Sequence, residues 1–303
     1  MVMSKPRLGN WGPTPGWGSM IESFDKWTGL CPNTTLFRSR GGEGQLDNEF
    51  VLKDSETAMS LGYLPSLQIQ PKTGSGSNRK GIPYKDISDG NHDTVIIKGL
   101  EEIKAAIPDK GVRIPFELHS EFNIQSSGAQ PYVGPPEDYA GFVKKVHDLA
   151  KQVGVRRRLK FIASATRGVW SSSEWHRWLD GCIDQIDCLA VDGYSQPKTG
   201  QPKEFEYLVL PIIDCAIESG KQWAVMETGC QEKSNDVDYK LGWYDRTGGF
   251  LETYLNTPSM PRCMYVVFNT SNDGSGGWQP TSSDKAYSAF IALCNRDIWK
   301  GGV

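Results

Sequence analysis

Short apolar segments and longer amphipathic segments alternate along the chain. The apolar segments have the length and the β-branched and aromatic content of buried strands. After a short opening strand within 8–17, we expect strands at 35–40, 64–70, 111–123, 159–165, 186–194, 223–229 and 264–269. Apolar residues at helical spacing predict helices at 19–27, 55–61, 92–107, 137–153, 174–183, 205–219, 239–256 and 283–294. This alternation is typical of parallel sheets whose strands are joined by helices.

The length of the pattern predicts a (β/α)8 TIM barrel that forms a single domain over 1–303. No segment has the composition of a linker between domains, so an open doubly wound sheet fits less well. No glycine-rich phosphate loop follows an early strand, and we expect no cofactor. The polar loop 72–89 is longer than a simple connection needs, which indicates a functional loop. In a barrel of this type, the active site forms at the carboxyl ends of the strands.

The strand predicted at 111–123 carries an unusual polar face. Alternation along a strand places Pro115, Glu117, His119 and Glu121 on one side, opposite an apolar side. Its apolar neighbours predict burial of both faces, and a buried carboxylate is costly unless it has a partner or a role. We therefore take Glu121, near the carboxyl end of this strand, as a candidate catalytic residue, and Glu117 as a structural one.

Other predicted strands also end in polar residues, which a barrel would bring to the same mouth. These residues are Asp192, Tyr194, Glu227 and Asn269. Two carboxylates from separate strands can cleave a glycosidic bond, because one protonates the leaving oxygen while the other attacks or stabilises the anomeric carbon. Glu121 and Glu227 are the expected pair. The alternative for Glu227 is a structural role as a capping partner for the residues that follow it.

Several further residues are candidates for substrate contact. Asn123 and Asn269 could bind sugar hydroxyls, and Asp192 is expected to support a ligand-binding group. Trp170 and Trp278 follow predicted strands, where an indole ring can stack on a sugar or simply pack. His119 could contact a sugar or be a neutral imidazole that is hydrogen-bonded inside the barrel.

Composition narrows the possible partners. The formal net charge is -3, and the longest basic run is Arg156 to Arg158, so neither nucleic acid nor an anionic membrane is expected as a partner. No run is long and apolar enough to span a bilayer, and the N-terminus does not resemble a signal peptide. The seven cysteines form no CxxC pair, and we assign neither disulfides nor a metal site. We expect synthesis in a reducing cytoplasm.

Five short motifs follow one another along the chain. They are Pro-Ser-Leu-Gln-Ile-Gln-Pro at 65–71, Ile-Ser-Asp-Gly-Asn-His-Asp at 87–93, His-Ser-Glu-Phe-Asn at 119–123, Asp-Cys-Leu-Ala-Val-Asp-Gly-Tyr at 187–194, and Met-Glu-Thr-Gly at 226–229. Taken in this order, they resemble clan A glycoside hydrolases, and most of all glycoside hydrolase family 26, the β-mannanase type, with its uncharacterised bacterial and phage relatives. The resemblance covers roughly residues 35–269.

The resemblance implies a role for three residues. Glu121 matches the family's general acid/base, Glu227 its nucleophile, and Tyr194 the tyrosine that orients the nucleophile. It also implies retention of configuration through a glycosyl-enzyme intermediate. The chain departs from the family at Ser120, where a histidine usually precedes the acid/base; here His119 lies one position earlier.

Three functions are therefore expected in order of preference. The first is a retaining, endo-acting glycoside hydrolase that cleaves a β-linked polysaccharide or cell-surface glycan. The second is a catalytically weak or inactive barrel that binds a glycan or assembles into a particle, either as a virion component or as a homo-oligomer, since a phage-associated protein could reach its glycan on a virion or after lysis. The third is a transglycosylase.

Overall fold

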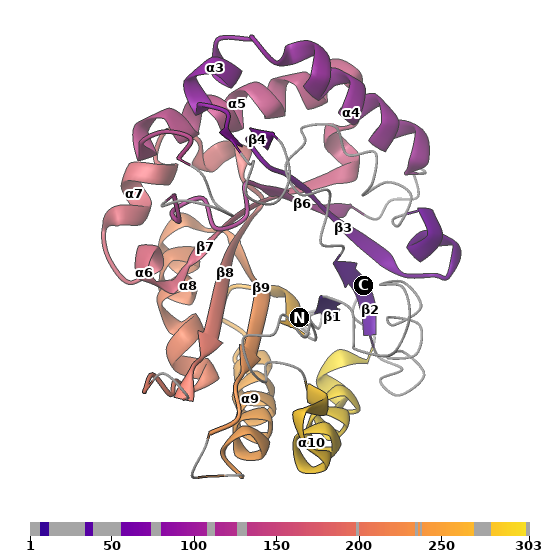
Figure 1. The fold of residues 1–303 in the computed structure, drawn as a ribbon, viewed down its shortest axis with the longest axis vertical. Helices are drawn as coiled ribbons and strands as arrows, with labels where there is room; N and C mark the ends of the chain where they lie inside the picture. The colour runs from indigo at the N-terminus through magenta and orange to yellow at the C-terminus, as the bar shows by residue number, and fades with distance from the viewer. Residues whose placement is uncertain are drawn as a thin grey trace. The chain divides into compact units, whose positions relative to one another are not determined.

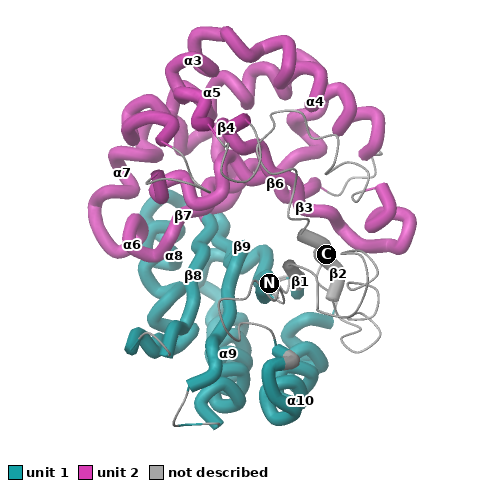
Figure 2. The backbone as a smooth tube through the Cα atoms, viewed as in Figure 1, with its two compact units in different colours: residues 1–38, 190–303 teal, residues 39–189 magenta. Residues whose placement is uncertain are grey.

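The computed structural model describes most of the chain as two compact units. The described residues are 7–11, 34–38, 56–73, 80–107, 113–125, 132–197, 200–233, 236, 238–269 and 280–300. Unit 1 comprises residues 1–38 and 190–303, and unit 2 comprises residues 39–189 (Figure 2). The predicted single domain stays a prediction, and each unit is described by itself.

Unit 2 contains three parallel strands with helices between them. The strands β3 (Leu64–Ile69), β6 (Ile114–Leu118) and β7 (Leu159–Thr166) are neighbours in that order. The helices α3 (Tyr84–Ser88) and α4 (Asp93–Ala106) pack against α5 (Pro136–Val153) (Figure 1). A small antiparallel hairpin joins β4 (Lys72–Thr73) to β5 (Lys80–Gly81). The short helices α6 (Arg167–Trp170) and α7 (Glu174–Leu179) follow β7.

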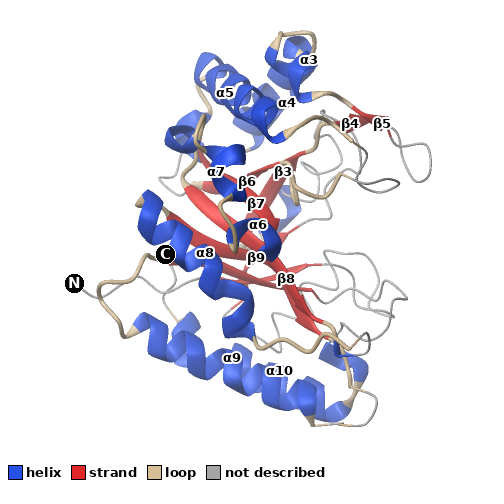
Figure 3. Cartoon of the chain, turned by 90° about the vertical axis from the view of Figure 1, so that its left-hand side faces the viewer, coloured by secondary structure: helices blue, strands red, loops and turns tan. Residues whose placement is uncertain are grey.

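Unit 1 contains the first two strands and the last three. The strands β2 (Thr34–Arg38), β1 (Arg7–Trp11), β10 (Cys263–Asn269) and β9 (Gln222–Cys230) pair in parallel in that order, and β8 (Cys188–Ser195) is the next neighbour of β9. The helices are α8 (Phe205–Ser219), α9 (Tyr239–Leu255) and α10 (Asp284–Cys294), and α9 and α10 lie side by side (Figure 3).

Local sequence explains where the long helices begin and end. Helix α5 starts with Pro136, whose fixed φ suits the first helical position, and stops at Gly154, which adopts φ 81°. Helix α8 stops in the same way at Gly220, with φ 68°. Helix α10 is capped by Ser283, whose hydroxyl oxygen accepts a hydrogen bond from the Ala286 amide at 3.2 Å.

The core includes strands whose residues are buried on both faces. Every residue of β6 and of β10 is buried. Phe116 of β6 packs on Phe161 of β7, with ring centroids 5.5 Å apart. The cysteines within the described residues are buried, and none of them forms a disulfide. Among the described helices, none is long and apolar enough to cross a membrane.

Most predicted elements are confirmed with shifts of a few residues at their ends. The loop predicted over 72–89 was wrong in part, because it contains β4, β5 and α3. The strand predicted over 111–123 was too long, since β6 ends at Leu118, and the helix predicted to reach Ile183 ends at Leu179. The helix predicted at 19–27 lies outside the described residues.

Asp187 connects the amino-terminal ends of the strands in unit 2. Its Oδ2 accepts hydrogen bonds from the Arg113 guanidinium at 2.5 Å, from Arg156 at 2.9 Å and from the Phe161 amide at 2.8 Å. Burial alone would raise the pKa of Asp187, but the bonds from Arg113 and Phe161 and the charge of Arg156 together lower it below its usual value. The carboxylate is therefore stabilised in the folded chain.

We predict that Asp187→Asn lowers the free energy of unfolding at neutral pH by about 2 to 3 kcal/mol, because two guanidinium groups lose their charge partner. Because the pKa of Asp187 is lower in the folded chain than in the unfolded chain, its carboxylate stabilises the folded chain at pH values above the unfolded pKa of about 4. This stabilisation is lost as the pH falls through the folded pKa. The difference in the free energy of unfolding between the unaltered chain and Asp187→Asn, measured with urea, should therefore shrink below about pH 4. Asp184→Asn, an exposed neighbour, is the matched control. Equal stability of Asp187→Asn and Asp184→Asn at neutral pH would contradict the prediction.

Candidate functional site

Glu121 lies just beyond the end of β6, in an unusual backbone conformation. The His119 amide still donates a hydrogen bond to the Ile69 carbonyl of β3 at 2.9 Å, as it would in a continuing strand. His119 and Glu121 then adopt φ values of 63° and 52°, in the left-handed region that residues other than glycine seldom occupy. The expected common face of Glu117, His119 and Glu121 is therefore wrong beyond Leu118, because side chains alternate only while the backbone is extended.

The side chain of His119 is held inside unit 2. It is 2% exposed, and its Nδ1 forms a short hydrogen bond with the Tyr84 hydroxyl of α3. Burial raises the pKa of Tyr84 well above its ordinary value, so the hydroxyl stays protonated. Of the two roles considered for His119, the contacts favour the buried, hydrogen-bonded imidazole over direct contact with a sugar.

Asn123 fixes the segment after Glu121 to the neighbouring strand. Its Nδ2 donates to the Thr166 hydroxyl at 2.7 Å, and its Oδ1 accepts from the Thr166 amide at 3.0 Å. The Ile124 amide donates to the Glu121 carbonyl at 2.8 Å and closes a turn. Between them, Phe122 is fully buried, with its ring centroid 4.6 Å from that of Tyr139. The half-buried Glu121 is thus carried on a well-anchored turn.

Glu227 lies in β9 of unit 1, where residues from the adjacent strands surround it. The Tyr194 hydroxyl of β8 donates a hydrogen bond to Glu227 Oε2 at 2.7 Å. The Asn269 side chain of β10 donates in turn to the Tyr194 hydroxyl oxygen at 3.1 Å. The Tyr194 hydroxyl proton points to Glu227, so its oxygen is left to accept the hydrogen bond from the Asn269 side-chain amide. Both hydrogen bonds therefore run in one direction, from Asn269 to Glu227. Asn269, Tyr194 and Glu227 thus form one relay across three strands.

The environment keeps Tyr194 neutral. Burial of its hydroxyl raises its pKa well above the ordinary value, and the negative charges of Glu227 and Asp192 act in the same direction. The bond from Asn269 opposes this shift without reversing it. Asp192, two residues before Tyr194 in β8, is 3% exposed, which suits a supporting role in the strand.

Two sequence-based alternatives can now be judged. The structural alternative for Glu227 was a capping partner at Thr228, but β9 continues through Cys230, and Thr228 donates its hydroxyl to the Gly193 carbonyl at 2.8 Å. That alternative is wrong. Trp170 is 3% exposed and donates its indole N–H to the Ala165 carbonyl at 3.2 Å, which favours packing over stacking on a sugar. Trp278 lies outside the described residues.

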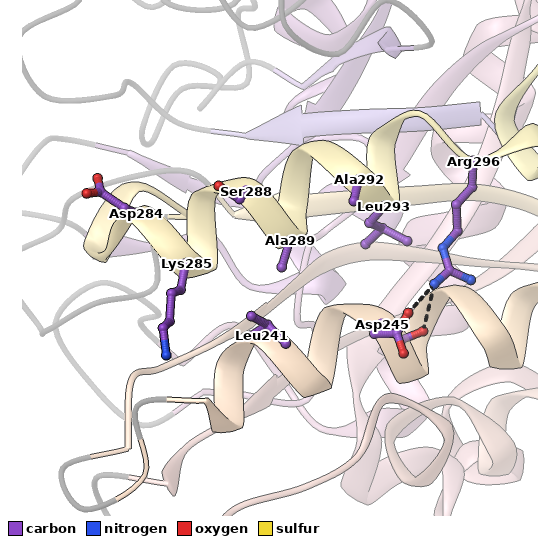
Figure 4. Close-up of a pocket in the computed structure, with 9 residues that line it drawn as sticks. All are labelled: Leu241, Asp245, Asp284, Lys285, Ser288, Ala289, Ala292, Leu293 and Arg296. Atoms are coloured by element: carbon purple, nitrogen blue, oxygen red, sulfur yellow. Dashed lines mark hydrogen bonds and ion pairs between the residues drawn. The ribbon is translucent and has the colours of Figure 1, made fainter.

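A hollow of about 510 Å³ lies on unit 1 between α9 and α10 (Figure 4). Leu241 and Ala289 point into it, and the ion pair between Arg296 and Asp245 lies at one end. All its lining residues belong to these two helices or follow α10, and none comes from the end of a strand. It is therefore no candidate for the catalytic site.

Sequence reasoning missed two residues that position the candidate acid. Tyr84 lies in the segment 72–89, which the sequence predicts to be a functional loop, and the length of that segment is the signal that could have pointed to it. Thr166 ends β7, and its pairing with Asn123 depends on a contact between distant parts of the chain. Among the described residues, no group of three or more His, Cys, Asp or Glu side chains could hold a metal ion.

No protein-family model matches the chain, and no curated protein matches its sequence. Solved structures do match. The catalytic domain of a family 26 endo-β-1,4-mannanase from Bacillus sp. JAMB-750 is 18% identical with a TM-score of 0.68, over 97% of this chain and 86% of that one. A family 26 β-mannanase from Bacteroides ovatus is 14% identical with a TM-score of 0.62, over 98% and 93%. A fungal β-1,4-galactanase is 12% identical with a TM-score of 0.63, over 97% and 100%.

The fold is a (β/α)8 barrel. The prediction of this fold class is confirmed, and so is the resemblance to family 26 glycoside hydrolases at the level of the fold. At these identities the likeness concerns the path of the chain. The roles of individual side chains have to be argued from their own contacts.

Proposed function

We propose that this protein is a retaining, endo-acting glycoside hydrolase that cleaves a β-linked polysaccharide. The observation that carries the proposal is the relay from Asn269 through Tyr194 to Glu227, which holds a carboxylate at a strand within a (β/α)8 fold. The similar solved structures include endo-β-1,4-mannanases and a β-1,4-galactanase, which supports a β-linked polymer as the substrate class.

The proposed reaction assigns a separate task to each carboxyl group. Glu227 attacks the anomeric carbon and forms an ester bond while the glycosidic C–O bond breaks, and Glu121 gives its proton to the leaving oxygen. Water then gives a proton to Glu121 and attacks the anomeric carbon, which releases Glu227 as a carboxylate. Two inversions give net retention. This mechanism requires carboxyl groups about 5 to 5.5 Å apart.

The contacts of each residue support its task. A neutral tyrosine hydroxyl donates a hydrogen bond to one Glu227 carboxylate oxygen and so fixes the orientation of the carboxylate. Glu121 occupies a left-handed conformation, and such backbone strain in residues other than glycine is concentrated at functional sites. The anchors on either side, His119 and Asn123, maintain this conformation.

We predict that Glu121→Ala and Glu227→Ala each lower the release of reducing ends from a panel of β-linked polysaccharides by at least about 10²- to 10⁴-fold. Glu206→Ala, an exposed acid on α8, should retain full activity and serves as the control. The panel should begin with mannan and galactan. Circular dichroism and urea unfolding would establish that each variant is folded.

Adding azide to each variant, with an activated aryl β-glycoside as the substrate, distinguishes the nucleophile from the acid/base. Azide that replaces the Glu227 carboxylate attacks the anomeric carbon once and gives an inverted, α-configured glycosyl azide. Azide acting in Glu121→Ala attacks the glycosyl ester and gives a β-configured product. Polymer cleavage at the rate of the unaltered chain by either variant, or the opposite pair of azide products, would refute the assignments. Polymer binding without turnover by the unaltered chain would instead support the glycan-binding alternative, and products longer than the substrate would indicate a transglycosylase.

We further predict that Tyr194→Phe lowers kcat/KM by about 10- to 100-fold, because Glu227 loses a hydrogen bond to its charged form. Tyr207→Phe, on the surface of α8, is the matched control and should behave as the unaltered chain does. Steady-state kinetics on one polymer suffice for this comparison. A Tyr194→Phe chain with unchanged kcat/KM would show that the relay does not serve catalysis.

A further inference from the structure

Unit 2 contains an open groove of about 610 Å³ that is lined in part by Asn123, Ile124 and Gln125, which closely follow Glu121 in the sequence. Its volume lies within the range of about 300 to 1,000 Å³ that is common for small-molecule sites. The residues that shape it are Asn123, Ile124, Gln125, Tyr132, Pro135 and Trp178. None of the described residues that line it carries a charge, so the groove suits a neutral ligand with both apolar and polar surface.

Tyr132 presents an aromatic ring at this groove. It is 66% exposed, more than any other exposed large hydrophobic residue within the described residues. A tyrosine ring offers a broad apolar face and loses little conformational entropy on binding. The apolar C–H face of a pyranose is a natural partner for such a ring.

The backbone beneath this ring is firmly held although the ring is exposed. The Gln125 side chain accepts hydrogen bonds at 3.1 Å from the amides of Val133 and of Gly134, and donates to the Phe122 carbonyl at 2.9 Å. The two sides of the groove are therefore joined. Val133 is 1% exposed, and its carbonyl accepts from the Tyr84 amide at 2.7 Å.

Two glycines make this arrangement possible. Gly134 adopts φ 141°, which other residues rarely adopt. A methyl group at Gly81 of β5 would collide with the Tyr132 carbonyl oxygen, so the hairpin approaches this segment closely. An exposed aromatic ring on such a fixed backbone is typical of a preorganised contact surface.

We propose that the groove binds a sugar unit on the leaving-group side of the scissile bond, with the Tyr132 ring as its stacking platform. The inference rests on the proposed function, in which Glu121 protonates the leaving oxygen. The leaving sugar must then lie beside Glu121, and the groove begins within the turn that the Ile124 amide closes onto the Glu121 carbonyl. A neutral hydroxylated ring matches the uncharged lining.

The test compares two substrates that differ on the leaving-group side. A polymer places a sugar in the groove, whereas an activated aryl β-glycoside of the same sugar replaces that unit by an aryl group. We expect Tyr132→Ala to lower the ratio of kcat/KM for the polymer to kcat/KM for the aryl glycoside on the order of tenfold. Tyr132→Phe keeps the ring and should keep most of the ratio, and Tyr207→Ala, an exposed tyrosine on α8, should leave it unchanged.

The outcomes separate this proposal from the proposed function. If the unaltered chain cleaves both substrates and Tyr132→Ala leaves the ratio unchanged, the groove is not a sugar site and the hydrolase proposal stands. If the unaltered chain cleaves neither substrate, the hydrolase proposal fails. Affinity electrophoresis in gels that contain the polymer then shows whether the groove binds sugar. In that experiment, weaker retention of Tyr132→Ala than of Tyr207→Ala supports a sugar site, and equal retention overturns it.

Discussion

The left-handed exit of the chain from β6 is the constraint on which unit 2 depends most. His119 and Glu121 both adopt positive φ values, and such a conformation persists only where the surroundings determine it. Tyr84 supplies much of this determination, because its hydroxyl bonds to His119 and its amide bonds to Val133 beneath the groove. One residue of α3 therefore positions both the candidate acid and the surface proposed for the leaving sugar.

In unit 1, hydrogen bonds from neighbouring strands orient the carboxylate of Glu227. A tyrosine whose hydroxyl remains protonated is a suitable partner, since it donates a hydrogen bond without adding charge. Asn269 completes the arrangement by donating to the same hydroxyl oxygen. That Asn269 could bind a sugar hydroxyl stays a prediction; its contact with Tyr194 gives it a supporting position beside Glu227.

The periodic parts of the sequence predicted the fold well, because long apolar strands and amphipathic helices carry strong local signals. The strand positions of Glu227 and Tyr194 were also predicted, since both lie in regular strands near their carboxyl ends. The exit from β6 was not predicted. The alternation of Glu117, His119 and Glu121 resembles a continuing strand, and the contact that holds His119 after the strand ends comes from Tyr84, which is distant in sequence. Tyr132 was not predicted, because it lies between the strand expected at 111–123 and the helix expected at 137–153, where no periodic pattern marks a residue.

Glu227 is the residue proposed to become bonded to the sugar. The most direct measurement is covalent labelling with an activated fluorosugar whose ring substituent slows the release of the glycosyl ester, followed by peptide mapping in a mass spectrometer. We expect one sugar per chain, attached to the peptide that contains Glu227. A label on another carboxylate, or turnover of a good substrate without any trapped ester, would contradict this role of Glu227.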